Sequence, residues 1–262
     1  MVKGDYHWAE QMVVVLARDL NDDDVVMVGG AHHTIAFAAV QLARRLYFPN
    51  MTLLFSRGYV NPQIIPLRFS GHISGIFSQH AEAKIGGYEI FELSENPFQR
   101  LTAFFYHGLQ IDRYGNVNLH FIGDPANPTI RGPGAVNISM GVTTRRHYLF
   151  PPRHNRRTFV EKVDFVTIPG FLDGENTRAQ ANIPGGGPTL CVSPLGVFDF
   201  EEGSKRMRVK SVHKHSSLEQ IRDNTGFELL IPGEIPVTGP PTRDEIKVLR
   251  TEIDPEGVLR ML

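Results

Sequence analysis

The chain has 262 residues, a hydrophobic content of 41%, a charged content of 21% and a formal net charge of −1. These values are typical of a globular protein with a large core, and they exclude a global attraction to nucleic acid. A single cysteine, Cys191, excludes an intrachain disulfide, and no apolar run reaches the roughly 18 to 20 residues of a membrane span. We therefore expect one soluble, cytoplasmic domain over residues 1–262, with neither nucleic acid nor a membrane as a partner.

The first part of the chain alternates helices with strands. Apolar spacing predicts helices over Trp8–Leu20 and Thr34–Leu46, and apolar runs predict strands over Val25–Val28 and Met51–Phe55. Strands separated by a helix pair in parallel, because the connection returns the chain to the same edge of the sheet. The sequence therefore predicts an α/β fold with a mainly parallel sheet.

Further strands and two late helices are expected beyond residue 100. Apolar runs and capping boxes, in which a Ser or Thr precedes a Glu by three residues, mark them. The expected elements are strands at Thr102–Phe105, Val163–Ile168 and Leu190–Ser193, a hairpin of Val197–Phe200 with Met207–Val212, and helices that begin at Ser216 with Glu219 and at Thr242 with Glu245.

The segment Gln110–Asn118 reads Gln-Ile-Asp-Arg-Tyr-Gly-Asn-Val-Asn and follows the apolar run Leu101–Tyr106. Its clustered polar side chains are typical of a ligand site at the carboxyl edge of a sheet, where loops hold donors and acceptors over a rigid floor. Gly115 favours a turn with positive φ. The alternative is an ordinary hairpin in which Asp112 and Asn116 satisfy the backbone groups of the turn.

Eleven histidines raise the question of a metal site. Neither cysteine partners nor an H-E-x-x-H helix accompany them, so we predict no metal and expect His213 and His215 to share a solvated strand face. His32 and His33 differ from the others because they follow the first strand. A loop there can reach the sheet's carboxyl edge.

A dense cationic block runs through Arg145–His147 and Arg153–Arg157. Three interpretations stay open: it binds the phosphates of a nucleotide-like ligand, it contacts an acidic partner surface, or it is solvated. Nucleic acid is the weakest ligand, because the block is short and contains few aromatic residues for stacking.

A second loop with small residues reads Gly132-Pro133-Gly134-Ala135 and leads to Asn137. Loops of this kind allow close approach of the backbone and expose N–H groups to an oxyanion. Pro133 lacks an N–H and is therefore excluded as a donor.

Taken together, these segments resemble the β subunit of class I, glutaconate-type, CoA transferases. The resemblance covers nearly the whole chain and rests most firmly on Gln110–Asn118 with Ile122-Gly123-Asp124, on Gly132–Asn137, on Asp164–Thr167 with Pro169-Gly170, and on Asn224–Phe227. It implies an open, mainly parallel sheet with helices on both faces. It also implies a homologous α subunit as partner, in α2β2 or larger assemblies, with acyl-CoA as substrate and no permanently bound cofactor.

In that family, the β subunit carries a glutamate nucleophile in a Glu-x-Gly tripeptide after the second strand. The corresponding tripeptide here is Ser56-Arg57-Gly58, so Ser56 occupies the place of the carboxylate. An unassisted serine hydroxyl is a poor nucleophile at neutral pH. Relatives without the glutamate carry out hydrolytic carbon–carbon cleavage or decarboxylation, and the resemblance makes such chemistry our leading expectation.

The resemblance also suggests site residues. We expect Ser56, His32 and His33 at the reacting centre, an imidazole of the pair moving protons. Gly29, Gly132, Gly134 and Asn137 are expected to shape the acyl-CoA pocket, and Gln110 and Asn116 to position the acyl group. Two alternatives stay open: a true CoA transferase whose nucleophile lies elsewhere, and a non-catalytic scaffold or CoA-sensing subunit.

Overall fold

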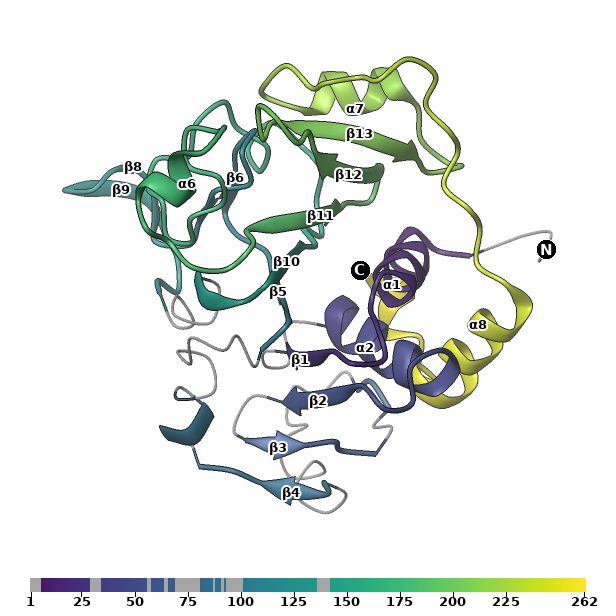
Figure 1. Cartoon of the computed structure of the whole chain (residues 1–262). Helices are drawn as coiled ribbons and strands as arrows, with labels where there is room; N and C mark the ends of the chain where they lie inside the picture. The colour runs from purple at the N-terminus through teal and green to yellow at the C-terminus, as the bar shows by residue number, and fades with distance from the viewer. Residues whose placement is uncertain are drawn as a thin grey trace. The chain divides into compact units, whose positions relative to one another are not determined.

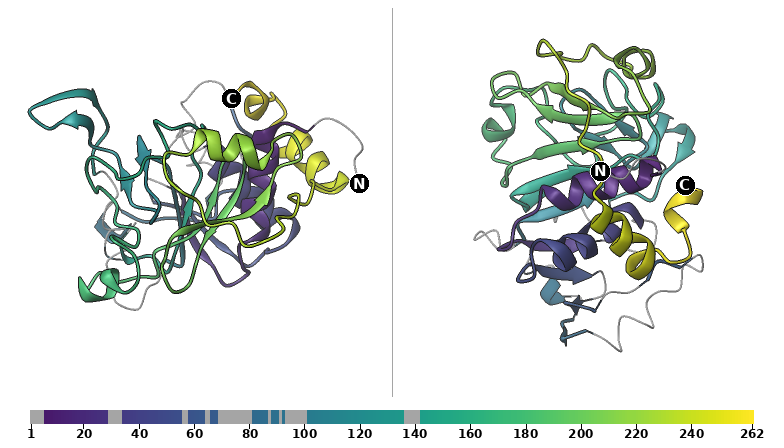
Figure 2. Two further views of the ribbon diagram at one scale, coloured as in Figure 1. Left: turned by 90° about the horizontal axis from the view of Figure 1, so that it is seen from above. Right: turned by 90° about the vertical axis from the view of Figure 1, so that its right-hand side faces the viewer.

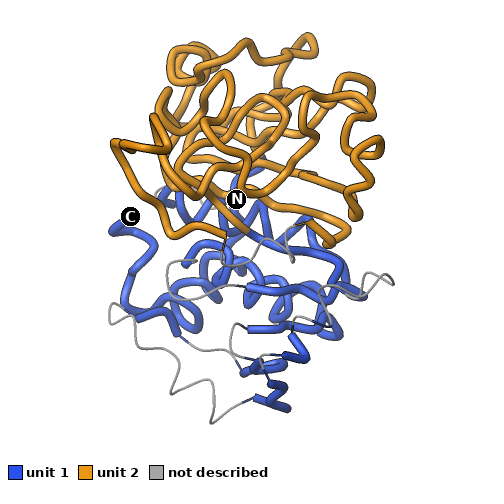
Figure 3. Tube along the Cα trace, turned by 90° about the vertical axis from the view of Figure 1, so that its left-hand side faces the viewer, with its two compact units in different colours: residues 1–105, 239–262 blue, residues 106–238 orange. Residues whose placement is uncertain are grey.

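The computed structural model describes residues 6–28, 34–55, 58–63, 66–68, 81–86, 88–90, 92, 101–135 and 142–262. Contacts divide the chain into two compact units, residues 1–105 with 239–262 and residues 106–238 (Figure 3). We call them unit 1 and unit 2 and describe each by itself. The single domain expected over residues 1–262 stays a prediction.

Unit 1 is built on a parallel core of strands. Strand β1 (Val25–Val28) pairs in parallel with β2 (Thr52–Phe55), and on its other side with β5 (Ala103–Tyr106). The short strands β3 (Tyr59–Val60) and β4 (Ala83–Lys84) continue from β2 in antiparallel fashion. The predicted strand–helix–strand order and the mainly parallel sheet are therefore confirmed.

The helices of unit 1 bury their apolar faces on one another and on the sheet. Helix α1 (Trp8–Arg18) packs against α2 (Thr34–Leu46), and α2 packs against α8 (Arg243–Val248) and the π-helix η1 (Leu249–Ile253) that continues it (Figure 1). A 3₁₀ turn, η2 (Val258–Met261), contacts α1. No helix in the described part of the chain is long and apolar enough to cross a membrane.

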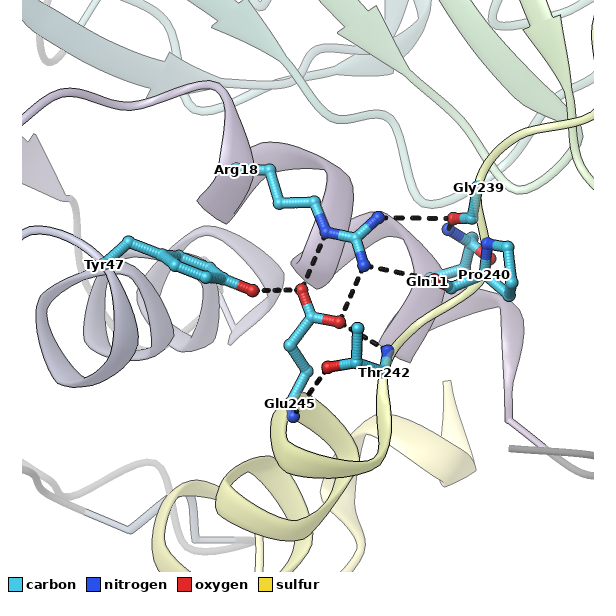
Figure 4. A network of polar contacts seen from close by, with 7 residues as sticks. All are labelled: Gln11, Arg18, Tyr47, Gly239, Pro240, Thr242 and Glu245. Carbon is cyan, nitrogen blue, oxygen red and sulfur yellow. Dashed lines mark hydrogen bonds and ion pairs between the residues drawn. The ribbon is translucent and has the colours of Figure 1, made fainter. Parts of the chain in front are cut away.

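A buried carboxylate fastens the C-terminal segment of unit 1 to its N-terminal helix (Figure 4). Glu245 accepts two hydrogen bonds from Arg18, from Nε and from Nη2, each at 2.7 Å. Tyr47 Oη donates to the same carboxylate, and so does the N–H of Thr242, the residue that caps the N-terminus of α8. The predicted capping box of Thr242 with Glu245 is thus confirmed, and the pKa of Glu245 is lowered by Arg18, Thr242 and Tyr47 in spite of burial, the largest influence.

Replacing Glu245 by Ala is expected to lower the free energy of unfolding by roughly 2 kcal/mol, because the Arg18 and Tyr47 contacts are lost together. This expected loss is smaller than for a fully buried ion pair, because the Arg18 side chain is 35% exposed. The matched control is Glu252→Ala, whose pair with Arg45 lies at the surface. Urea unfolding should show a control loss below about 0.5 kcal/mol; equal losses in both variants would contradict the assignment.

Unit 2 combines a four-stranded sheet with two small hairpins. Strands β10 (Arg146–Leu149) and β11 (Pro188–Val192) are parallel, and β12 (Gly196–Phe200) and β13 (Met207–Val212) follow as the predicted antiparallel hairpin. Helix α7 (Leu218–Asn224) packs against β12 through Ile221, and α6 (Thr177–Gln180) is a single turn. The hairpin of β8 (Phe121–Asp124) and β9 (Asn127–Arg131) extends away from the rest of the unit (Figures 1 and 2).

Three expectations in unit 2 are wrong. Residues 163–168 form no strand: only Ile168 makes a bridge, to Val117, and the backbone of Asp164 is tied instead to the Gln110 side chain. The first late capping box is one residue further on, at Ser217 with Gln220. His213 is buried rather than solvated, because its imidazole bonds to Thr238 Oγ1 and to the Ser193 carbonyl.

Candidate functional site

The segment Gln110–Asn118 folds as a hairpin. Strands β6 (Gln110–Ile111) and β7 (Val117–Asn118) pair antiparallel, and the Gly115 N–H closes the turn on the Asp112 carbonyl at 3.0 Å. Gly115 has φ +68°, and a Cβ there would lie 2.7 Å from Pro188 Cγ, so both conformation and packing demand glycine. The local geometry is that of the hairpin alternative.

Asp112 and Asn116 form the core of this turn. One Asp112 oxygen accepts the N–H groups of Tyr114 and Asn116 at 2.9 and 3.1 Å, and the Asn116 amide donates to both carboxylate oxygens. The Asn116 oxygen in turn accepts the N–H groups of Gly170 and Leu172. Asn116 is therefore the link that fixes the hairpin to residues 170–172.

The carboxyl group of Asp112 has a pKa above its usual range. Burial raises its pKa to about 6, and the hydrogen bonds from Asn116 and from backbone N–H groups oppose the rise. It borders a hollow of about 410 Å³ that Arg113, Tyr114, Asn116 and Lys162 also line. A second hollow, of about 500 Å³, lies in unit 1 around Arg44, Leu53 and Asn61 and contains none of the expected site residues, so the hollow beside the hairpin is the more relevant of the two.

Gln110 uses its amide to hold a neighbouring loop. Its oxygen accepts the Asp164 N–H at 2.9 Å and the Asn118 amide at 2.7 Å, and its NH2 donates to the Asp164 carboxylate at 3.2 Å. The hydrogen bonds of Gln110 and Asn116 therefore hold the hairpin in place against its neighbouring loops. A direct role of either side chain in positioning an acyl group stays a prediction.

The loop Gly132–Ala135, which we call the glycine loop, does not offer the free N–H groups of Gly132 and Gly134 that the sequence predicts. The Gly132 N–H donates to the His120 carbonyl at 2.8 Å, and the Gly134 N–H donates to the Leu119 carbonyl at 2.9 Å. These two N–H groups are therefore used within the chain and do not face an oxyanion. A Cβ on Gly132 would lie 2.1 Å from the Leu119 oxygen, which explains the glycine at this position. The contribution of Gly132 and Gly134 to substrate binding stays a prediction.

The sequence analysis missed His120, whose imidazole lies beside this loop. Its Nδ1 bonds to Thr167 Oγ1 at 2.7 Å, and its ring contacts that of Phe165 with centroids 4.5 Å apart. A lone histidine after Leu119 carries no sequence signal. Its neighbours Gly134 and Thr167 are remote along the chain, so only the fold brings them together.

Five expected site residues, Gly29, His32, His33, Ser56 and Asn137, lie outside the described residues. Two of them, Gly29 and Ser56, follow strands β1 and β2 directly in the sequence. The last residues of these strands, Val28 and Phe55, are partners in the parallel register, so β1 and β2 end at the same edge of the sheet.

Gly58 completes the tripeptide after β2. Its N–H donates to the Phe55 carbonyl at 3.0 Å, its φ is +85°, and a Cβ would lie 1.9 Å from the Ile85 oxygen. Phe55 and Gly58 are therefore held close together, and only glycine fits at this end of the connection. The two residues between them in the sequence are Ser56 and Arg57.

The cationic block does not form one surface. His147 is fully buried, with Nδ1 2.6 Å from Tyr106 Oη, and burial lowers its pKa to about 3. Burial also lowers the pKa of His154 to about 3, and its ring is held by Ser193 and Thr225. Both imidazoles are neutral at physiological pH. Among the described residues, no group of three His, Cys, Asp or Glu side chains could hold a metal ion.

Comparison with known protein families decides the classification. The profile described as "Coenzyme A transferase" matches residues 9–224. The chain belongs to the coenzyme A transferase family. It is similar to the B subunit of glutaconate CoA-transferase from Acidaminococcus fermentans, with 34% identity over 94% of this chain and 92% of the relative. The crystal structure of that transferase superposes with a TM-score of 0.87 at 29% identity, covering 97% of both chains.

Two other relatives have names that point to different reactions. The cholesterol ring-cleaving hydrolase IpdB subunit of Rhodococcus jostii is 31% identical over 57% of this chain and 58% of the relative. The crystal structure of the decarboxylase AibA/AibB superposes with a TM-score of 0.83 at 27% identity, covering 98% of this chain and 99% of that one. The family resemblance and the α/β fold class are thereby confirmed, and the names of these relatives include a transferase, a hydrolase and a decarboxylase.

Proposed function

We propose that the chain is the β-type subunit of a heteromeric enzyme that acts on an acyl-CoA thioester by hydrolytic carbon–carbon cleavage or by decarboxylation. The supporting observation is Ser56. In the sequence it follows β2 directly and stands two residues before Gly58, where the family resemblance leads one to expect the glutamate of a Glu-x-Gly tripeptide. A carboxylate is ionised at neutral pH, whereas a serine hydroxyl needs a neighbouring base before it attacks a thioester.

The partner and the substrate follow from the same relatives. The glutaconate CoA-transferase relative is a B subunit by name, and the decarboxylase is named as a pair, AibA/AibB. We propose a homologous α subunit as the partner, coenzyme A as part of the substrate rather than a bound cofactor, and a cytoplasmic location. His32 or His33, or a residue of the α subunit, moves the proton that either reaction requires.

CoA transfer is the second candidate. The B subunit of glutaconate CoA-transferase matches 94% of this chain, whereas the ring-cleaving hydrolase subunit matches only 57%. A transferase function requires a nucleophile other than Ser56, from this chain or from the α subunit.

The three reactions are separated by their products. The chain is purified with the protein encoded by its genomic neighbour and incubated with cyclic and dicarboxylic acyl-CoAs in ¹⁸O-labelled water. Label in a ring-opened acid or release of carbon dioxide supports the proposal. CoA that moves to an added free acid, without label or carbon dioxide, establishes transfer and overturns it. The scaffold alternative is favoured if the complex forms product at an unchanged rate after Ser56, His32 and His33 are each replaced by Ala.

A further inference from the structure

The imidazole of His120, which has no role in the proposed reaction, lies beside Gly134 in the glycine loop. Because the N–H groups of Gly132 and Gly134 donate to carbonyl oxygens and Pro133 has none, the backbone of these three residues offers no free donor there. The imidazole of His120 is different. No described residue bonds to its Nε2, although its Nδ1 is firmly held.

The ring of His120 is fixed on several sides. Thr167 Oγ1 contacts Nδ1 at 2.7 Å, the Phe165 ring packs against the imidazole, and the His120 backbone N–H donates to Asn118 at 2.9 Å while its carbonyl accepts the Gly132 N–H. A side chain held in this way loses little conformational entropy when it binds a ligand. The residue is thus preorganised without a partner at Nε2 among the described residues.

We assign the tautomer of His120 from the hydrogen bonds of Thr167. Its hydroxyl oxygen accepts the Leu119 N–H at 2.8 Å, and the only acceptor that the described residues offer to its own proton is His120 Nδ1. With Nδ1 as an acceptor, the neutral imidazole carries its proton on Nε2. Nε2–H is therefore a donor.

Space for a ligand atom lies beside this donor. A Cβ built on Gly134 would lie 3.9 Å from Nε2 and 4.0 Å from Cδ2 of His120, and apart from Gly134 and its two chain neighbours no other described residue has an atom within 4 Å of it. Gly134 has φ +76°, a conformation that L side chains rarely adopt. The loop therefore keeps the flank of the imidazole open.

We propose that His120 is a substrate-binding residue whose Nε2–H donates a hydrogen bond to an oxygen of the acyl group. This inference rests on the proposed action on acyl-CoA and adds to it a residue that distinguishes an acyl-CoA from CoA itself. In this chain, the imidazole supplies the donor that the backbone of a glycine loop supplies in an oxyanion hole.

Two substitutions separate the ring's two nitrogens. In His120→Asn, the amide reaches the position of Nδ1 and retains the contact with Thr167 but leaves nothing at Nε2. In His120→Gln, the amide reaches the position of Nε2 and retains the donor. His215→Asn is the matched control, an exposed histidine of unit 2 that bonds to the Pro194 carbonyl.

The test measures binding of CoA and of glutaryl-CoA to the complex of this chain with its α partner, by titration calorimetry. We expect glutaryl-CoA to bind more tightly than CoA, and His120→Asn to weaken glutaryl-CoA about tenfold, the size of one hydrogen bond. CoA binding should not change in this variant. His120→Gln and the control should retain most of the preference for the acyl-CoA.

The outcomes distinguish this inference from the proposed function. Glutaryl-CoA binding that is unchanged in His120→Asn, or CoA binding that falls equally, overturns the role of His120 and leaves the acyl-CoA function standing. A wild-type complex that binds neither compound overturns the acyl-CoA function itself. Thermal unfolding of each variant checks that the fold is intact.

Discussion

Acidification from about pH 7 to about pH 5 is expected to lower the free energy of unfolding of unit 2 by roughly 4 to 5 kcal/mol. Burial lowers the pKa values of His147 and His154 to about 3 and that of His213 to about 4, from an ordinary value of 6.5. Below pH 6.5 the unfolded chain therefore binds protons that the folded chain excludes. Each histidine then removes about 2 kcal/mol of stability at pH 5.

Protonation of Asp112 has the opposite effect on the free energy of unfolding. Because burial raises its folded pKa from 3.8 to about 6, the folded chain binds this proton first as the pH falls. The protonated carboxyl group adds stability as the pH falls through 6, and this contribution is complete below 3.8. At pH 5 it offsets roughly 1 kcal/mol of the loss from the histidines.

Hydrogen exchange read by mass spectrometry measures this effect in peptides from β10 to β12, at a series of pH values corrected for the intrinsic exchange rate. His154→Asn should lower stability at neutral pH but reduce the further loss on acidification by about 2 kcal/mol. Lys210→Gln, at the surface, should leave the pH dependence unchanged, because Lys210 shifts the pKa of none of the three histidines. Protection in the wild type that is the same at pH 7 and at pH 5 would show that the three histidines are not held neutral.

Replacing Asn116 by Asp is expected to lower the free energy of unfolding by about 3 to 5 kcal/mol. The change places a second carboxylate where the Asn116 amide now lies 2.9 and 3.2 Å from the two Asp112 oxygens, and it leaves the Leu172 carbonyl without its donor. Both carboxylates are buried and have like charge, so the folded chain retains a proton between them.

Thermal unfolding measures this loss, with Asn182→Asp as the control because Asn182 also lies in a turn but is exposed. The Asn116→Asp variant should regain stability relative to the wild type as the pH falls from neutral toward 3.8, the ordinary Asp value, because the folded pair binds protons that the unfolded carboxylates do not. If the two Asp variants are equally stable at neutral pH, the Asn116 amide is not the link that holds the hairpin.

Much of unit 1 was predicted from the sequence. The bounds of β1 and α2 agree with the sequence prediction because each is a continuous buried run or a regular apolar stripe, and local periodicity is enough to define such elements. The strand expected at Val163–Ile168 is absent for the opposite reason. Only Ile168 of this segment forms a bridge, to Val117 of β7. The Asp164 N–H donates to the Gln110 side chain instead of to a neighbouring strand.

The candidate site was predicted less well, because its chemistry depends on contacts between remote residues. Nothing in the sequence near His154 indicates that Phe159 and Ser193 enclose its ring, and its arginine neighbours placed it in the predicted cationic block. His120 became visible only when Gly134 and Thr167 were placed beside it. Ser56 is recognised from the sequence alone, two residues before Gly58, and its role stays a prediction.

The central claim is that this chain handles an acyl-CoA without a covalent glutamyl-CoA intermediate. Its most direct test is intact-mass spectrometry of the wild-type complex after incubation with glutaryl-CoA and with a cyclic acyl-CoA, with the Ser56→Ala variant in parallel. The account predicts that the mass of this chain does not change while product forms. A stable increase by the mass of CoA less one water, as a thioester on any glutamate of the chain, would contradict it and restore CoA transfer.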